Sequence, residues 1–454
     1  PSIVDNSQHI YWRPVFAQIQ YECGQASGVG LGFTYAINRL RDLPSNVTEN
    51  QYPTHFVWNF GNGGDGWYGV SYFHSFEIIK REGTPNVIDF GGMTGTGPEM
   101  WMTGYDKYYN AMHNRIADVY KIDLTTEEGI NTLRNWIDNH LDGSEVGGVA
   151  NFYTNAPYGM PTLPSGTPEA GKYVVTSWGY ANHGLTISGY HDSIRWDYNS
   201  DGQYTNDIDL NGDGEITPRD WEIGGLRFAN TYSGGPSWAN NGFCYMTYKS
   251  CADPYGSGGI WDNAAHVLYA KAGTEPLLTA KIGISYNCRN RLRVQMGMST
   301  DINAETPDYV IGYPIFNFQG GCQYMQGGTS NEDNKTIEIG LDITPFLNII
   351  EPGTPARYFL ILTENDPEGW AWGQMLNYSI IDYTNGAEEI ICEESNVNIN
   401  NNGVTRFWVN HEADYEKVEI TNEVLTPATV YEPYSEQLEA SGGAAPYYWS
   451  LSLI

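Results

Sequence analysis

Three residues far apart in the chain have side chains that together could hydrolyse an amide bond: Cys23, His183 and Asn230. A thiol becomes a strong nucleophile when a nearby imidazole accepts its proton, and the same imidazole can later protonate the leaving amine. A side-chain amide beside the imidazole holds one tautomer and one ring orientation. We therefore expect Cys23 to act as nucleophile, His183 as base and Asn230 as the group that orients the base.

The elements that must position these side chains follow from local patterns. The stretch from Gly24 to Asp42 predicts a helix with one apolar side, formed by Val29, Phe33, Ile37 and Leu40. Cys23 then lies at a helix N-terminus, where the helix dipole and free N–H groups favour a thiolate and lower its pKa. His183 begins the segment NHGLTISGY and Asn230 lies in LRFANTYSGGPSWANNGFCY, and both segments have the composition of strands with glycine-rich turns.

The rest of the first 273 residues predicts helices followed by strands. A glycine turn precedes a helix with Tyr72, Phe73, Phe76 and Ile79 on its buried side, and Thr125 with Glu128 forms a capping-box pattern before another helix. The segment VGGVANFY then predicts a strand. We expect an α+β fold of two sub-domains, one helical and one of β structure, with a cleft between them.

Four segments in this order resemble the papain-like cysteine peptidases: FAQIQYECGQAS, NGGDGWYGVSYFHSFEIIKREG, NHGLTISGY and FANTYSGGPSWANNGFCY. The resemblance covers residues 10 to 270 and implies a papain-like fold and peptide-bond hydrolysis through Cys23, His183 and Asn230. The oxyanion needs fixed donors, for which we expect the backbone N–H of Cys23 and the side chain of Gln18, with Gln20 as the alternative. The resemblance also implies that Gly63 and Gly64 lie beside the substrate backbone.

The cysteine motif departs from the family pattern, which has two cysteines three positions apart, the second being the nucleophile. Here C-G-Q-A-S contains only one cysteine. If Cys23 matches the first family cysteine, Ala26 takes the nucleophile's place, and the chain is an inactive papain-like binding module of a multidomain surface protein. If Cys23 is the nucleophile, the spacing from Gln18 is one residue short of the family's. The leading hypothesis is the active cysteine endopeptidase.

An acidic insertion, residues 192–222, separates the two predicted strands and contains nine acidic and two basic residues. Within it, a D-x-N-x-D-G-x-x-x-x-x-D pattern has oxygen ligands at alternate positions and glycine at the bend, as a calcium ion requires. The predicted calcium ligands are Asp209, Asn211, Asp213, the Glu215 carbonyl and Asp220. A weaker copy consists of Asp197, Asn199, Asp201 and the Gln203 carbonyl. Its twelfth position is Ile208, so Asp207 or Asp209 would have to close it.

Composition excludes several classes of function. A net charge of −31 argues against binding a nucleic-acid backbone or an anionic membrane, and no run of about 18 apolar residues exists to span a bilayer. The six cysteines show neither a disulfide framework nor zinc-ligand spacing, although Cys244 and Cys251 are close enough in sequence for a local disulfide. The expected partners are a protein or peptide substrate and calcium.

The composition changes after residue 273, where short strands alternate with turn residues and no strong helix pattern remains. We expect residues 1–273 to form the peptidase domain, 274–417 an all-β sandwich that either binds surface carbohydrate or protein or is a stabilising accessory, and 418–454 the start of an Ig-like domain. The last segment resembles the opening strands of cadherin-like repeats in bacterial surface proteins. This resemblance implies a secreted or cell-surface protein of bacterial origin.

Overall fold

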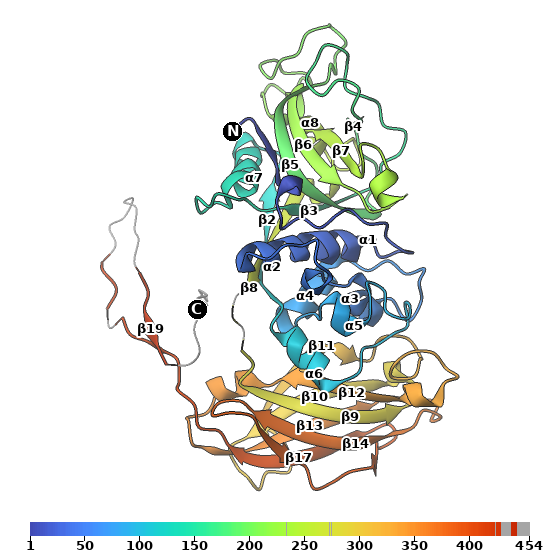
Figure 1. Cartoon of the computed structure of the whole chain (residues 1–454), viewed down its shortest axis with the longest axis vertical. Helices are drawn as coiled ribbons and strands as arrows, with labels where there is room; N and C mark the ends of the chain where they lie inside the picture. The colour runs from blue at the N-terminus through green and yellow to red at the C-terminus, as the bar shows by residue number, and fades with distance from the viewer. Residues whose placement is uncertain (233, 272, 274, 423, 428–436, 443–454) are drawn as a thin grey trace. The chain divides into compact units, whose positions relative to one another are not determined.

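A computed structural model of the 454-residue chain describes residues 1–232, 234–271, 273, 275–422, 424–427 and 437–442 (Figure 1). The chain divides into two compact units, the first formed by residues 1–100 and 114–271 and the second by residues 101–113 and 272–454. Within the described residues, no helix combines the length and the apolar character needed to cross a membrane.

The first unit contains one long helical run that begins at the predicted nucleophile. It consists of α1 (Cys23–Gln25), a π-helical segment (Ala26–Phe33) and α2 (Thr34–Arg41). Gly28 allows close packing, because a Cβ there would lie 2.6 Å from the Cβ of Tyr72. The wider π-helical turns change the phase of the helix, and Leu40, predicted to be buried, is 42% exposed.

The other helices of this unit are α3 (Thr54–Gly61), α4 (Tyr72–Arg81), α5 (Val87–Phe90), α7 (Glu127–Asn139) and α8 (Tyr248–Ala252). Of these, α3 and α4 contact that run, whereas α7 and α8 contact strands of the unit's sheet. The N-cap of α7 is Thr126, whose side chain accepts the Gly129 N–H, so the predicted capping role of Thr125 is wrong. Thr125 instead donates its hydroxyl to Asp123.

One sheet carries the strands of the first unit in the order β2-β8-β3-β5-β6-β7-β4, with β1 paired to β5. Only the β4–β7 pair is parallel among these described pairings. The strands are β1 (Ile3–Asp5), β2 (Arg115–Asp123), β3 (Ala150–Thr154), β4 (Val174–Val175), β5 (His183–Arg195), β6 (Ile223–Ala229), β7 (Phe243–Thr247) and β8 (Ala264–Lys271). Helices and a largely antiparallel sheet make this unit α+β.

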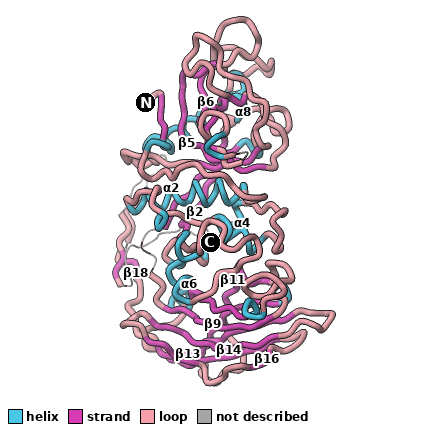
Figure 2. Tube along the Cα trace, turned by 45° about the vertical axis from the view of Figure 1, so that its right-hand side comes forward, coloured by secondary structure: helices cyan, strands magenta, loops and turns pink. Residues whose placement is uncertain are grey.

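The second unit has two antiparallel sheets, with strand orders β11-β10-β13-β17 and β12-β9-β14-β15, and β16 paired to β14. Tyr378 of β14 donates its hydroxyl to the Tyr358 carbonyl of β13 and so joins the two sheets, whose strands β9, β11, β13, β14 and β16 are labelled in Figure 2. The strands are β9 (Leu278–Tyr286), β10 (Leu292–Ser299), β11 (Tyr309–Asn317), β12 (Thr336–Asp342), β13 (Pro355–Glu364), β14 (Gly373–Asp382), β15 (Glu388–Ile391), β16 (Val397–Asn398) and β17 (Val404–Glu412).

A segment from the first quarter of the chain also belongs to the second unit. Residues 101–113 contain α6 (Tyr105–Met112), which lies on β12 (Figure 1). Gly340 of β12 makes this contact close, because a Cβ there would lie 3.0 Å from the Tyr108 Cβ. No local sequence pattern predicted this arrangement.

The predicted Ig-like segment, residues 418–454, lies largely outside the described residues. Its described part contains β18 (Glu419–Ile420) paired with β19 (Ala440–Ser441). One disulfide joins Cys288 to Cys322 in the second unit. Cys244 and Cys251 are both free, so the suggested local disulfide between them is absent.

Candidate active site

Cys23 is the first residue of α1 and lies against the start of β5. Its sulfur is 3.9 Å from the Asn182 carbonyl oxygen. Gly184, the residue after His183 in the chain, packs so closely on Cys23 that a Cβ at Gly184 would be 3.3 Å from the Cys23 carbonyl oxygen. The thiol is free and partly exposed, whereas Cys244, Cys251 and Cys392 are buried.

His183 is the first residue of β5, and Asn230 directly follows β6, the strand paired with β5. The Nε2 atom of His183 is 2.9 Å from Asn230 Oδ1. Because Asn230 Oδ1 also accepts the Tyr232 N–H at 3.0 Å, this atom is the amide oxygen, and Nε2 must be the donor. The neutral imidazole then has an unprotonated Nδ1, which can accept a proton.

Burial sets the ionisation of the thiol and the imidazole. It raises the pKa of Cys23, and the N–H groups of Gly184, Gly24 and Cys23 itself only partly offset the effect. Burial also lowers the pKa of His183, against the hydrogen bond to Asn230, which raises it. The expected lowering of the Cys23 pKa at the helix start is therefore wrong, because the thiolate loses more solvation than the amides restore.

Gln18 and Gln20 lie in different surroundings. Gln18 is held beside the Asn230 region: Thr231 donates its hydroxyl to Gln18 Oε1 at 2.9 Å, and the Gln18 N–H donates to the Thr231 carbonyl at 2.9 Å. Gln20 has a φ of +60°, and its side chain covers Gly66. Of the two amides, Gln18 is the one fixed next to the segment that carries Asn230.

Gly63 and Gly64 form a tight turn with φ of +69° and +77°. The Gly64 N–H donates to the Asn62 side chain at 2.8 Å, so backbone conformation alone explains why glycine occurs here. The glycine of this region that lines the cleft beside Cys23 is Gly69, which the sequence did not indicate.

The cleft beside Cys23 has a volume of about 470 Å³. Aromatic side chains form much of its wall, and Tyr153 is fixed there by stacking on Tyr72 at 4.1 Å between ring centroids. The residues that line it come from α1, the segment before and within α4, β3, and the segments before β5 and β8: Cys23, Gly69, Val70, Ser71, Phe73, Tyr153, Ala181, Asn182, Tyr255 and Trp261. Such a cleft can accept an apolar side chain next to the thiol.

The predicted calcium loop, residues 209–220, is ordered by its own carboxylates. Asp209 accepts the N–H groups of Gly212 and Gly214 at 2.7 and 2.9 Å, and Asp213 accepts that of Glu215 at 3.0 Å. Loop 197–208 repeats the pattern, since Asp197 accepts the Gly202 N–H at 2.9 Å and Asp201 accepts the Gln203 N–H at 2.7 Å. Asn211 and Asn199 each accept the N–H two residues later.

A buried carboxylate closes each loop in the same way. In loop 209–220, Asp220 accepts the N–H groups of the second and ninth residues, Leu210 and Thr217, both at 3.0 Å. In loop 197–208 this place is taken by Glu222, which accepts the N–H groups of the second and ninth residues, Tyr198 and Thr205, at 2.8 and 3.2 Å. Asp220 and Glu222 are 0% and 1% exposed. The sequence missed Glu222 because it lies 14 residues beyond the end of the loop that it closes.

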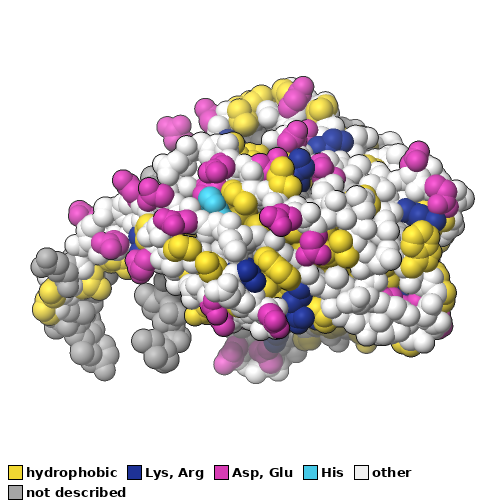
Figure 3. All heavy atoms as spheres, turned by 90° about the horizontal axis from the view of Figure 1, so that it is seen from below, with side chains coloured by type: hydrophobic (Ala, Val, Ile, Leu, Met, Phe, Trp, Pro, Cys, Tyr) yellow, Lys and Arg dark blue, Asp and Glu magenta, His cyan; other side chains and the backbone are white. Residues whose placement is uncertain are grey.

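No group of three or more His, Cys, Asp and Glu side chains within the described part of the chain is arranged to hold a metal ion. The loops nevertheless offer an all-oxygen donor set, which is the chemistry that calcium prefers. On the face drawn in Figure 3, acidic side chains are spread among uncharged ones and do not form one patch.

Neither a protein-family model nor a curated protein matches the chain. Among solved structures, the chain is similar to xylellain, a cysteine protease from Xylella fastidiosa. The similarity has a TM-score of 0.36 and 12% sequence identity and covers 59% of this chain and 86% of xylellain.

Proposed function

We propose that the chain is a cysteine peptidase that hydrolyses peptide bonds through Cys23, His183 and Asn230. One juxtaposition carries the proposal: the Cys23 residue touches both neighbours of His183 in the chain, Asn182 and Gly184, while His183 donates to Asn230. In this proposal a nucleophile, a base and a group that orients the base act together beside the cleft that Cys23 lines.

In the proposed mechanism the resting pair is uncharged, because burial raises the pKa of Cys23 and lowers that of His183. His183 Nδ1 takes the thiol proton as the sulfur attacks the substrate carbonyl carbon. The Cys23 N–H and the Gln18 amide stabilise the oxyanion. His183 then gives the proton to the leaving amine, which leaves a thioester on Cys23, and water hydrolyses the thioester with His183 again as base.

We propose that the substrate is a protein or peptide with an apolar or aromatic side chain that enters the cleft of about 470 Å³. Gly69 leaves room for the substrate backbone at the rim, a role that the sequence resemblance gave to Gly63 and Gly64. The alternative of an inactive binding module requires Ala26 in the nucleophile's place. The lining of the cleft by Cys23, and not by Ala26, supports the active enzyme.

We also propose that both acidic loops bind calcium. Asp220 would close the first site, and Glu222, instead of Asp207 or Asp209, would close the second. The remaining ligands would be the oxygen groups of Asp209, Asn211, Asp213, Glu215, Asp197, Asn199, Asp201 and Gln203. Because the loops connect β5 to β6, bound calcium would stabilise the strands that carry His183 and Asn230.

We propose that the protein is secreted or displayed at a bacterial cell surface. The Cys288–Cys322 disulfide supports this location, since disulfides persist mainly in oxidising compartments. Calcium binding fits the same environment, in which weak extracellular calcium sites are occupied.

Substitution of the nucleophile tests the enzymatic proposal. Cys23→Ala should reduce the hydrolysis of a fluorogenic peptide library by about 10⁴-fold or more, because no other group can form the thioester. Cys392→Ala, which removes a buried free cysteine of the second unit, is the matched control and should retain full activity. Equal hydrolysis by the Cys23 variant and the wild-type protein would exclude the mechanism.

A further inference from the structure

The loop between β13 and β14 in the second unit exposes two tryptophans. Trp370 is 47% exposed and Trp372 is 61% exposed, although they are only two residues apart. Large aromatic side chains left in water on one loop usually mark a binding surface. The question is whether the loop is ordered enough to present them to a ligand.

A buried carboxylate orders this loop from the inside. Asp366 is 0% exposed and accepts the Ala371 N–H at 2.6 Å and the Glu368 N–H at 3.3 Å. Asn402 fixes the loop from outside, because it accepts the Asp366 N–H at 2.9 Å and donates to the Asp366 carbonyl at 2.7 Å. The loop therefore has a defined conformation in the absence of a ligand.

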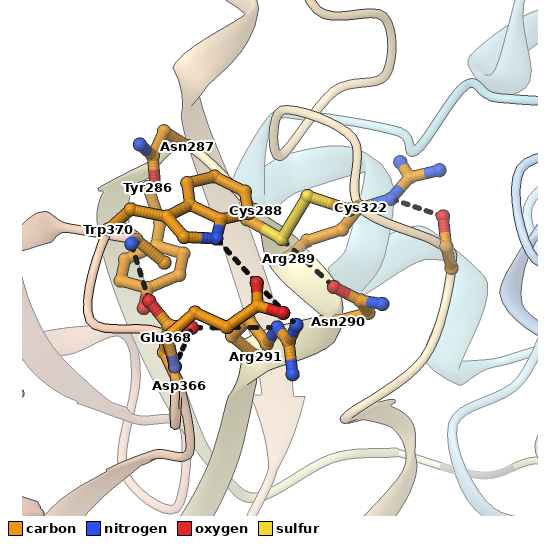
Figure 4. The surroundings of a disulfide bond; sticks show 12 residues. Tyr286, Asn287, Cys288, Arg289, Asn290, Arg291, Cys322, Asp366, Glu368 and Trp370 are labelled. Atoms are coloured by element: carbon orange, nitrogen blue, oxygen red, sulfur yellow. Dashed lines mark hydrogen bonds and ion pairs between the residues drawn. A yellow bond between two sulfur atoms is a disulfide. The ribbon is translucent and has the colours of Figure 1, made fainter. Parts of the chain in front are cut away.

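Both tryptophans are individually anchored. The Trp370 indole N–H donates to Glu368 at 2.8 Å, and Arg291 lies 3.6 Å from the same carboxylate (Figure 4). The backbone of Trp372 is held by Asn287, whose side chain accepts the Trp372 N–H at 2.9 Å. A ring or backbone that is already fixed loses little conformational freedom on binding, which favours a stable complex.

The groups around the rings have mixed polarity. Lys335 lies between two aromatic rings, 5.5 Å from the centroid of Trp372 and 4.9 Å from that of Tyr324. Glu368 and Arg291 carry opposite charges and lie beside Trp370, and both remain partly exposed. The surface thus combines flat apolar faces with hydrogen-bond donors and acceptors, without a dominant charge.

We propose that Trp370 and Trp372 form a binding site for a neutral polysaccharide. A pyranose ring has an apolar C–H face that stacks on an indole and a rim of hydroxyls that bond to carboxylate, guanidinium and amide groups. The net charge of −31 disfavours anionic polymers. The site would hold the protein on a glycan surface, a function independent of peptide hydrolysis.

The test uses the full chain, a panel of neutral polysaccharides (cellulose, xylan, chitin, mannan and β-glucan) and one anionic polysaccharide for comparison. At least one neutral polysaccharide should retain the protein, and retention should persist at about 1 M NaCl, where exposed charges are screened. Trp370→Ala and Trp372→Ala should each weaken binding about tenfold or more. Trp408→Ala, which removes a 39% exposed tryptophan from β17 of the same unit, is the matched control and should bind normally.

A second measurement needs no variant and so does not depend on folding of the alanine proteins. The bound polysaccharide should protect Trp370 and Trp372, but not Trp408, from oxidation by N-bromosuccinimide, as read by peptide mass spectrometry. The proposal is overturned if no neutral polysaccharide binds, if only anionic polymers bind and salt releases them, or if protection falls elsewhere.

Discussion

The segment that carries Gln18 and Cys23 is held in place by a buried contact between the Glu22 carboxylate and the His55 imidazole. Glu22 and His55 are each 1% exposed, and Glu22 Oε2 lies 3.1 Å from His55 Nε2. The other carboxylate oxygen accepts the Ile19 N–H at 2.8 Å. His55 Nδ1 faces the Thr94 carbonyl at 3.1 Å and must donate to it, since a carbonyl oxygen only accepts.

Glu22→Ala removes the carboxylate, so the His55 ring and the Ile19 N–H each lose the Glu22 oxygen that they contact. A buried polar group left without its partner costs about 1–3 kcal/mol, so the two lost contacts together cost about 2–6 kcal/mol of unfolding free energy. For a unit of this size, that corresponds to a fall in Tm of about 4–24 °C. Glu22→Gln should cost only about 1 kcal/mol, because the amide can still accept the Ile19 N–H and donate to the His55 ring.

Differential scanning calorimetry of the wild-type protein and the two Glu22 variants measures these differences, and peptide hydrolysis assays give kcat for each. We expect kcat to follow the order wild type, Glu22→Gln, Glu22→Ala, because the Ile19 contact fixes the chain between Gln18 and Cys23. The reasoning is refuted if Glu22→Ala melts within about 1 °C of the wild type, a difference well under 1 kcal/mol. It is also refuted if the two substitutions are equally damaging.

Three further predictions concern the catalytic groups and the loops. His183→Ala should abolish hydrolysis, whereas Asn230→Ala should leave measurable residual rates, because Asn230 only orients the base; equal losses would contradict these roles. Burial lowers the pKa of His183, so the imidazole stays neutral and can accept a proton at pH values below its ordinary pKa. Burial raises the pKa of Cys23, so the thiol stays protonated at pH values above its ordinary pKa. The acid limb of the kcat/KM profile should therefore lie below the ordinary histidine pKa of about 6.5, and the alkaline limb above the ordinary cysteine pKa of about 8.5; limbs at those ordinary values would contradict this. Calcium at a hundredfold its Kd should add about 2.7 kcal/mol of stability, and EDTA should reverse it. Asp213→Ala and Glu222→Gln should each reduce the calcium-dependent rise in Tm, and an unchanged melt with EDTA would identify the insertion as a solvated acidic loop.

Local patterns predicted the elements that carry the candidate triad. The segment after Asn182 is rich in apolar and β-branched residues and forms β5, and the segment before Asn230 forms β6. Burial of one continuous apolar surface produces such patterns within a few residues, so they can be read without a structure. The helix after Cys23 was predicted for the same reason.

Contacts between distant residues could not be predicted in this way. Glu222 closes a loop that begins at Asp197, and Glu22 meets His55 across 33 positions. The spacing of ligand residues cannot reveal a partner outside its own motif. The placement of residues 101–113 on the second unit likewise depends on packing of α6 against β12, which has no local signature. The π-helical segment Ala26–Phe33, whose glycines pack closely on other elements, also escaped prediction.

The central claim is that His183 activates Cys23 as a nucleophile, and the kinetics of alkylation by iodoacetamide test it most directly. Peptide mass spectrometry should find the label on Cys23, with loss of peptide hydrolysis in proportion to labelling. Exposure alone favours Cys23 over the three buried free cysteines, so the decisive comparison is the labelling rate in His183→Ala, with His9→Ala as the control. We predict much slower labelling of Cys23 in His183→Ala at neutral pH and an unchanged rate in the control. Equal rates in all three proteins, or hydrolysis that persists after complete alkylation of Cys23, would contradict the claim.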